Sequence, residues 1–279
     1  MTLCSPAVIC DAETDRPLQG RDRFTVPPEV QSDADRLAKA EYGREPSKAA
    51  ELARQMLDLY AAARDKDIII VFNPGGWGWA TVAQMPLWAS ILKGMQETLA
   101  GLGQKVLVAN YQRANHSLSG ALTEFLALSN LSRAKGRELA TRADFLTRHL
   151  PCLKVILAGE SNGAAMAEDA MGFLRANARV FSVQTGTPFW APSEPFVRSL
   201  IINHNGVEPD TFSNGDARRW FTANVQALFG KYKTEQGNIL LYIGAPGHVY
   251  NWDYPVVREK IIKFLKEEVI EPSKPVART

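Results

Sequence analysis

Cysteine and histidine are scarce in this chain, with three cysteines and four histidines in 279 residues. The odd number of cysteines (Cys4, Cys10 and Cys152) excludes a framework in which every cysteine forms a disulfide. We expect free thiols in a reducing cytoplasm, with Cys152 in or near the core because it precedes an apolar stretch. No group of cysteines and histidines has the spacing of a zinc site, so neither a metal nor another cofactor is predicted.

The chain also lacks a strong charge and a long apolar run. Its formal net charge is +2, and no basic block is interleaved with aromatic residues, so nucleic-acid binding is not predicted. No apolar run approaches the roughly 20 residues that span a bilayer. The N-terminus has no Lys or Arg before its short apolar stretch, which is not typical of a secretory signal. These absences predict a cytoplasmic protein without a transmembrane segment.

The stretch from Lys154 to Gly163 reads K-V-I-L-A-G-E-S-N-G and is the most informative in the chain. Its apolar start predicts a strand, and the alanine-rich residues 164–169 that follow predict a helix. The pattern G-x-S-x-G between a strand and a helix is typical of a nucleophile elbow, a strained turn that exposes a serine hydroxyl. Ser161 is therefore the predicted nucleophile. Gly159 and Gly163 flank it because side chains there would collide with the neighbouring strand and helix.

The five letters alone are a weak signal, because glycine and serine are common residues. The alternative is a glycine-rich turn in an α/β protein of another kind. The nucleotide-binding patterns G-x-G-x-x-G and G-x-x-x-x-G-K-[ST] are not present in the glycine-rich loop that follows residues 68–72, so a phosphate cradle there is disfavoured.

An elbow serine needs a histidine late in the chain and an acid between the two. His248 fits this order, because it follows an apolar strand and a loop with two glycines and precedes a helical pattern at residues 255–265. On such a loop the imidazole can accept the serine proton and return it to the leaving group. The alternative is a loop histidine that caps the last helix or is merely exposed.

The acid is expected on the loop after the strand at 199–203, where it would orient the imidazole of the histidine. Asp210 is the first choice, because it comes soon after that strand and Phe212 next to it can anchor the loop. Glu208 and Asp216 stay open as alternatives. Asp216 is an equally good N-cap for the helix expected from residue 217, since Asp is favoured at that position.

Acyl transfer also needs backbone N–H groups that bind the developing oxyanion. One is expected from Asn162, the residue after the nucleophile. The other is expected from the loop after the first core strand, which reads N-P-G-G-W-G-W at residues 73–79. Glycines let a backbone approach a ligand closely, so Gly76 or Trp77 is the predicted second donor.

The chain alternates between predicted strands and helices from residue 68 onward. Strands are expected near 68–72, 105–110, 154–158, 179–184, 199–203 and 239–243, and helices near 82–101, 119–149, 163–176, 216–230 and 255–269. Such alternation predicts an α/β fold, a three-layer sandwich with a mostly parallel sheet of about six strands covered on both faces. The predicted site residues then lie at the carboxyl ends of strands, where ligands bind in such sheets.

These pieces together resemble the α/β-hydrolase superfamily. The resemblance runs from about residue 66 to 268 and rests on N-P-G-G-W-G at 73–78, G-E-S-N-G at 159–163, the acidic loop at 208–216 and G-H at 247–248. It implies a serine hydrolase with a Ser-Asp-His triad and no metal. The chain has Asn-Pro-Gly-Gly where a His-Gly pair is common in the superfamily, which leaves the second oxyanion donor open.

Three segments are expected: an N-terminal arm with a helical extension (1–66), an α/β-hydrolase domain (67–270) and a flexible tail (271–279). The extension predicts two helices broken near Gly43 and Pro46, packed on the domain. Roles as a lid or as a contact in a homodimer are the alternatives. The segment 185–198 is too short to hold a large cap domain.

Aromatic residues gather near the predicted site along the sequence. We expect Trp77, Trp190 and Trp252 to line an apolar acyl pocket, although most aromatics in any chain serve packing. The predicted function is hydrolysis of a small-molecule carboxylic ester or thioester through an acyl-enzyme on Ser161. The rival from another class is a catalytically silent protein of the same fold that binds a ligand or a partner.

Overall fold

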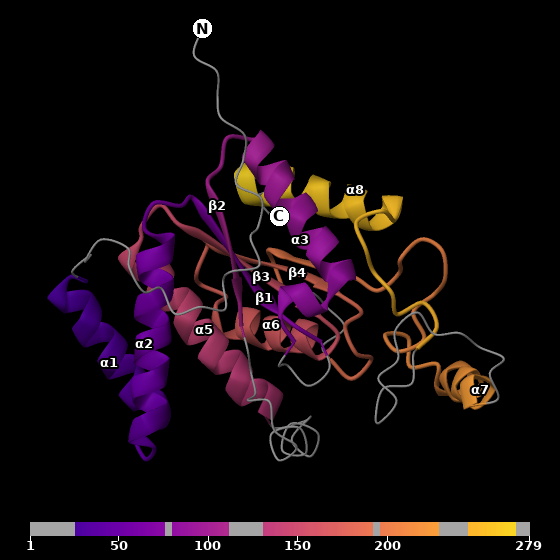
Figure 1. Cartoon of the computed structure of the whole chain (residues 1–279), viewed down its shortest axis with the longest axis horizontal. Helices are drawn as coiled ribbons and strands as arrows, with labels where there is room; N and C mark the ends of the chain where they lie inside the picture. The colour runs from indigo at the N-terminus through magenta and orange to yellow at the C-terminus, as the bar shows by residue number, and fades with distance from the viewer. Residues whose placement is uncertain (1–25, 76–79, 112–130, 192–195, 229–244, 272–279) are drawn as a thin grey trace, which may run out of the picture.

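A computed structural model of the chain describes residues 26–75, 80–111, 131–191, 196–228 and 245–271. Within these ranges the chain forms a five-stranded parallel sheet in the order β2-β1-β3-β4-β5 (Figure 1). The strands are β1 (Ile68–Asn73), β2 (Val106–Asn110), β3 (Lys154–Glu160), β4 (Val180–Thr185) and β5 (Ser199–Ile202). The predicted α/β class and five of the six predicted strands are confirmed. The sixth, at 239–243, lies outside the described residues.

Helices connect and cover these strands. They are α1 (Pro28–Tyr42), α2 (Pro46–Ala63), the short 3-10 helix η1 (Val82–Gln84), α3 (Pro86–Gly101), α5 (Leu131–His149), α6 (Asn162–Phe173), α7 (Ala217–Leu228), α8 (Pro255–Phe264) and the π-helical turn η2 (Leu265–Ile270). Four of the α-helices begin at a proline, where the missing N–H costs no hydrogen bond and the fixed φ suits the first turn. The predicted break between the first two helices falls between Tyr42 and Pro46.

The sheet is the middle of three layers. Side chains along each strand point alternately to its two faces, and helices pack against each face. On one face, Ile69 of β1 and Val155 of β3 pack against α1, α2, α5 and α6. On the other, Ile70 of β1 and Ile156 of β3 pack against α3 and α8. Figure 1 shows α3 and α8 on one side of the sheet and α2, α5 and α6 on the other. Both faces are thus covered, as an apolar parallel sheet requires.

Partly buried polar contacts join the N-terminal helices to α5. The Tyr42 hydroxyl donates to Glu138 Oε2 at 2.5 Å, and Arg142 Nη1 donates to Glu138 Oε1 at 2.6 Å. A second amino group of Arg142 donates to Gln55 of α2. Burial raises the pKa of Glu138, but the charges of Arg142 and Lys135 and the hydrogen bonds outweigh burial and lower it to about 2. The carboxylate therefore stays charged inside the contact between the extension and α5.

Glu138→Gln is expected to lower the free energy of unfolding at pH 7 by about 3–5 kcal/mol, because buried Arg142 loses its counter-charge. A carboxyl whose pKa is lowered on folding adds stability above its ordinary value of 4.5 and loses that stability as the pH falls towards about 2. The difference between wild type and variant in urea unfolding should therefore shrink from pH 5 to pH 2.5. Glu51→Gln, which breaks an exposed pair with Arg54, is the control and should cost at most about 1 kcal/mol. Equal urea midpoints for wild type and Glu138→Gln would contradict the expectation.

The predicted burial of Cys152 is wrong, because this thiol is exposed. Cys152 lies in the turn between α5 and β3, and burial begins only with Leu153. The chain has to reverse direction at the surface before it enters the sheet, so the residue just ahead of an apolar strand is not itself in the core.

None of the helices in the described part of the chain combines the length and the apolar character that a membrane crossing requires.

Candidate active site

Ser161 occupies a strained turn between β3 and α6. Its backbone has φ 52° and ψ −120°, a conformation that side-chain-bearing residues rarely adopt. The Ser161 N–H donates to the Thr185 carbonyl of β4 at 3.0 Å, while its own carbonyl accepts from Ala164 at 2.9 Å in the first turn of α6. The sheet and the helix therefore hold the turn from both sides. The geometry has the form predicted for a nucleophile elbow.

The two motif glycines are required by sterics. A Cβ atom on Gly159 would lie 2.5 Å from the Gly163 carbonyl oxygen. A Cβ atom on Gly163 would lie 2.1 Å from the carbonyl oxygen of Asn73, at the end of β1. Both distances are far below van der Waals contact, so any side chain would push α6 away from the sheet. Glycine at these positions lets the helix start directly above the strands.

His248 and Asp210 form a buried pair. His248 Nδ1 lies 2.8 Å from Asp210 Oδ2, and the two side chains are 4% and 0% exposed. Asp210 also accepts hydrogen bonds from the backbone N–H groups of Phe212 at 2.9 Å and Ser213 at 3.1 Å. The hydroxyl groups of Ser213 and Tyr250 also donate hydrogen bonds to Asp210, at 2.9 Å and 2.7 Å. Both oxygens of the Asp210 carboxylate thus have hydrogen-bond partners among the described residues.

These partners keep Asp210 ionised. Burial alone would raise its pKa, but the hydrogen bond and the charge of His248, with the donors Tyr250 and Ser213, outweigh burial and lower the pKa. Burial and the nearby Asp210 charge raise the pKa of Tyr250, so its hydroxyl stays a neutral donor. An ionised Asp210 next to Nδ1 favours the tautomer in which Nδ1 carries the proton and Nε2 is the basic atom.

Ser161 and His248 both contact the end of β4. The Thr185 carbonyl accepts from the Ser161 N–H, and the next residue, Gly186, lies against the imidazole. A Cβ atom on Gly186 would lie 2.4 Å from Cε1 of His248, and the glycine has a φ of 60°. A glycine is needed here because the backbone approaches the ring closely in a left-handed conformation.

The other two candidate acids have different partners. Glu208 forms an ion pair with Arg219 on the surface. Asp216 accepts from the Arg219 backbone N–H at 3.0 Å and caps the N-terminus of α7. Of the three acids left open by the sequence, Asp210 is the one that contacts His248 in the structure.

Only part of the predicted oxyanion site is described. Asn162 is the first residue of α6, and the N–H groups in the first turn of a helix point out of its N-terminus. Gly76 and Trp77 lie outside the described residues. The preceding residue, Gly75, is close to the turn, since a Cβ atom there would lie 3.4 Å from Cβ of Ser161. The start of the loop after β1 therefore reaches the Ser161 turn.

The predicted pocket tryptophans differ in their surroundings. Trp190 is 47% exposed, and its ring centroid lies 5.1 Å from that of Phe212, which lies 5.1 Å from the ring of His248. Trp252 packs against α3, where its ring fills the space next to Gly94. Trp77 lies outside the described residues. The structure thus brings Trp190 into the neighbourhood of His248 and uses Trp252 to pack a helix.

Tyr250 and Asn205 contact the loops that carry Asp210 and His248, roles that were not predicted from the sequence. Tyr250 stands two positions after His248, and side chains at i and i+2 of an extended segment share a side, which was the available signal. Asn205 donates to the carbonyls of Gly247 at 3.2 Å and Val249 at 3.0 Å. These hydrogen bonds join the chain that leads from β5 to Asp210 with the loop that carries His248. An isolated asparagine carries no pattern that reveals such a role.

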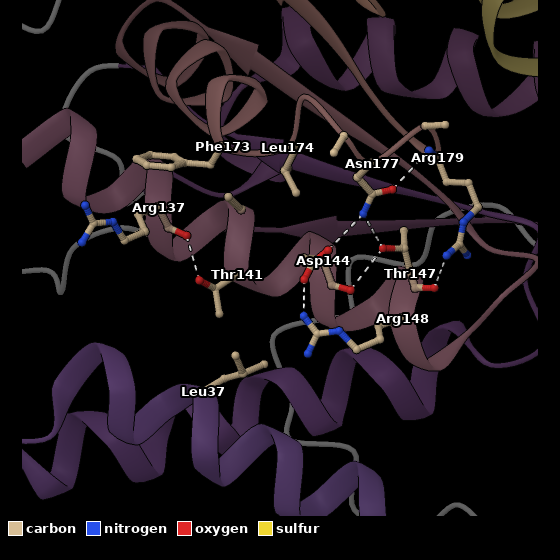
Figure 2. A pocket seen from close by; sticks show the side chains of 13 residues that line it. Leu37, Arg137, Thr141, Asp144, Thr147, Arg148, Phe173, Leu174, Asn177 and Arg179 are labelled. Carbon is tan, nitrogen blue, oxygen red and sulfur yellow. Dashed lines mark hydrogen bonds and ion pairs between the residues drawn. The ribbon is translucent and has the colours of Figure 1, made fainter.

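A hollow lies away from these residues, between α1, α5 and the end of α6. Its volume is about 650 Å³, and its polar walls are bonded to one another (Figure 2). Arg148 pairs with Asp144, and Asn177 donates to Asp144 at 3.2 Å and to Thr147 at 2.8 Å. Among the described residues no group of three or more His, Cys, Asp or Glu side chains is arranged to hold a metal ion.

The fold is of the α/β class, and the proposed site residues gather beyond the carboxyl ends of β3, β4 and β5. No protein-family model matches the sequence, and no curated protein matches it. Among solved structures, the chain is similar to Trichoderma reesei cutinase in complex with a C11Y4 phosphonate inhibitor, with 15% identity, a TM-score of 0.42 and coverage of 86% of this chain and 91% of that one. It is also similar to a novel cutinase-like protein from Cryptococcus sp., with 15% identity, a TM-score of 0.34 and coverage of 48% of this chain and 74% of that one. Both similarities are too distant to assign an activity.

Proposed function

We propose that the protein is a serine hydrolase that cleaves a carboxylic ester or thioester through an acyl-enzyme on Ser161. The observation that carries this proposal is the buried His248–Asp210 pair, which lies against the same end of β4 that holds the strained Ser161 turn. A hydroxyl group on a strained turn, a histidine and an ionised carboxylate are the parts that nucleophilic acyl transfer needs.

In the proposed reaction, Ser161 Oγ attacks the acyl carbon and His248 Nε2 takes the serine proton. Asp210 holds the imidazole in the productive tautomer and stabilises its charged form. The Asn162 N–H and a donor from the loop after β1, Gly76 or Trp77, bind the oxyanion. His248 then protonates the leaving group, and a water molecule, activated by the same imidazole, hydrolyses the acyl-enzyme.

The aromatic side chains support an apolar substrate. Phe189 is 60% exposed, and its ring centroid lies 5.0 Å from that of Trp190. Trp190 contacts Phe212, which contacts His248, so a row of rings runs from the surface to the proposed base. Ligand sites are mostly apolar with a few placed polar groups. We therefore propose that Trp190, with Trp77, binds the acyl chain of a neutral ester.

A fluorophosphonate probe tests the proposal, because it reacts with an activated serine. Wild type should be labelled, Ser161→Ala should not, and Ser182→Ala, which removes a buried hydroxyl in β4, should be labelled like wild type. Folded wild type that takes no label would contradict the function and favour a silent ligand-binding protein.

A panel of p-nitrophenyl esters of different acyl-chain length tests the proposed pocket. Trp190→Ala should change the preference for acyl-chain length, and an unchanged preference would contradict the role of Trp190.

A further inference from the structure

A second carboxyl group is buried directly beside the proposed nucleophile. Glu160 is the last residue of β3 and is 8% exposed. Because side chains alternate along a strand, Glu160 follows Ile156 and Ala158 on the face covered by α3 and α8. Trp88 and Tyr250 belong to the apolar cluster on this face. The proposed reaction assigns no part to Glu160, although a buried carboxyl in an apolar layer is costly.

One contact and the register of the sheet place this carboxyl near the site. Its Oε2 atom lies against Gly75, where an added Cβ atom would be 3.2 Å away. Its partner in the sheet is Thr185, and the residue after Thr185 is Gly186, which touches the His248 ring. Neighbouring strands lie about 4.8 Å apart. The Glu160 carboxyl therefore lies between the start of the loop after β1 and the end of β4, and the charges of His248 and Asp210 act on it.

We propose that Glu160 is a positioning residue whose carboxylate acts with Asp210 to stabilise the protonated imidazole of His248 during acyl transfer. This inference rests on the proposed function. Formation of the acyl-enzyme moves a proton from Ser161 to His248 and creates a positive charge. An anion in the same buried site stabilises that charge more strongly than it would in water.

The charges around Glu160 agree with this role. Burial raises the pKa of Glu160 to about 7, while the positive charge of His248 opposes the rise and the negative charge of Asp210 adds to it. Tyr250 is the third titratable group that interacts with the carboxyl, and Gly75 and Thr185 carry no charge. Near neutral pH the Glu160 carboxyl therefore loses its proton more readily when His248 carries a positive charge.

Glu168 shows how a buried carboxyl with a structural role differs, and it provides the control. It lies on α6, accepts from the Phe196 backbone N–H at 3.0 Å and from the Gln184 side chain, and ties the helix to β4 and the chain beyond it. Burial raises its pKa as well, but the groups that act on it are Gln184, Phe196, Ser199 and Asp169. None of these belongs to the proposed triad.

The test measures the pH dependence of probe labelling and of kcat/KM for an activated ester. Glu160→Gln keeps the shape of the side chain and removes its charge. The acid limb of both profiles should move to lower pH by about one unit, and kcat at the optimum should fall about tenfold. Glu168→Gln should leave both profiles where they are. A wild type that takes no label overturns the proposed function, whereas an active wild type whose profile Glu160→Gln leaves unchanged overturns the role of Glu160 alone.

A second measurement needs neither activity nor a folded Glu160 variant. Carbon-13 NMR of glutamate carboxyl groups follows the ionisation of Glu160 directly, and its midpoint should lie near pH 7. His248→Asn should raise this midpoint, because a neighbouring positive charge is lost, and Asp210→Asn should lower it, because a negative charge is lost. A midpoint that neither substitution moves overturns the coupling.

Discussion

Replacing His248 by asparagine is expected to lower kcat/KM for an activated ester about a millionfold, the loss typical of removing the base from an acyl-transfer triad. Without the imidazole no group accepts the Ser161 proton, so the hydroxyl remains a weak nucleophile. Asparagine is smaller than histidine and fits beside Gly186, so the loop should keep its conformation. Fluorophosphonate labelling of this variant should be lost together with ester hydrolysis.

The chain offers a matched control in His149. Its Nε2 atom lies 2.9 Å from Asp33 Oδ2, so it also pairs with an aspartate, but at the contact between α1 and α5. His149→Asn should leave kcat/KM within about twofold of wild type and lower the free energy of unfolding by about 1 kcal/mol, the usual net value of one hydrogen bond. If His149→Asn lost activity as His248→Asn does, loss of stability would explain both results. The assignment of His248 as the base would then be contradicted.

The strand, turn and helix around Ser161 could be predicted because their causes are local. An apolar run, a glycine on each side of the serine and an alanine-rich segment each favour one conformation within a few residues. The structure adds the reason for the glycines, since Gly159 and Gly163 face carbonyl oxygens 2.5 and 2.1 Å from an added Cβ atom. The alternation of strands and helices predicted the sheet in the same way.

The partners of these elements could not be predicted, because they depend on contacts between distant parts of the chain. Helical spacing predicted α1 and α2, but the contact of Tyr42 and Gln55 with α5 joins residues 96 and 87 positions apart. For the same reason the sequence could not show that Trp252 packs on α3 next to Gly94. An aromatic residue near a predicted site in sequence has many surfaces on which to pack.

The choice among the three acids was also beyond the sequence. All three stand on one loop, and its conformation depends on Asn205, which accepts from Val207 and Glu208 and donates to the histidine loop. Those hydrogen bonds hold the turn after β5, and the two to the histidine loop join residues that are far apart in the sequence. The structure turns Asp210 towards His248.

Asp210→Asn is expected to lower kcat about ten-thousandfold with little change in KM, as when the aspartate of a serine triad is replaced by its amide. An asparagine NH₂ group facing Nδ1 would donate a hydrogen bond to it, which shifts the ring proton to Nε2 and removes the basic atom that Ser161 needs. Steady-state kinetics on a p-nitrophenyl ester measure the effect. Urea unfolding shows whether the loop survives the loss of a carboxylate that accepts from Tyr250 and Ser213.

Glu208→Gln and Asp216→Asn are the controls, because each removes one charge from the same loop. Glu208→Gln breaks an exposed pair with Arg219, and Asp216→Asn keeps a good N-cap for α7, so each should cost at most about 1 kcal/mol of stability and leave kcat within about twofold of wild type. A large loss of kcat in either control, with Asp210→Asn active, would mean that the working enzyme turns a different acid towards His248. The loop would then have to break the hydrogen bonds of Asn205 and bury a different carboxyl in place of Asp210, which is 0% exposed. Because that rearrangement gives up several buried hydrogen bonds at once, we expect the loss of activity to follow Asp210 alone.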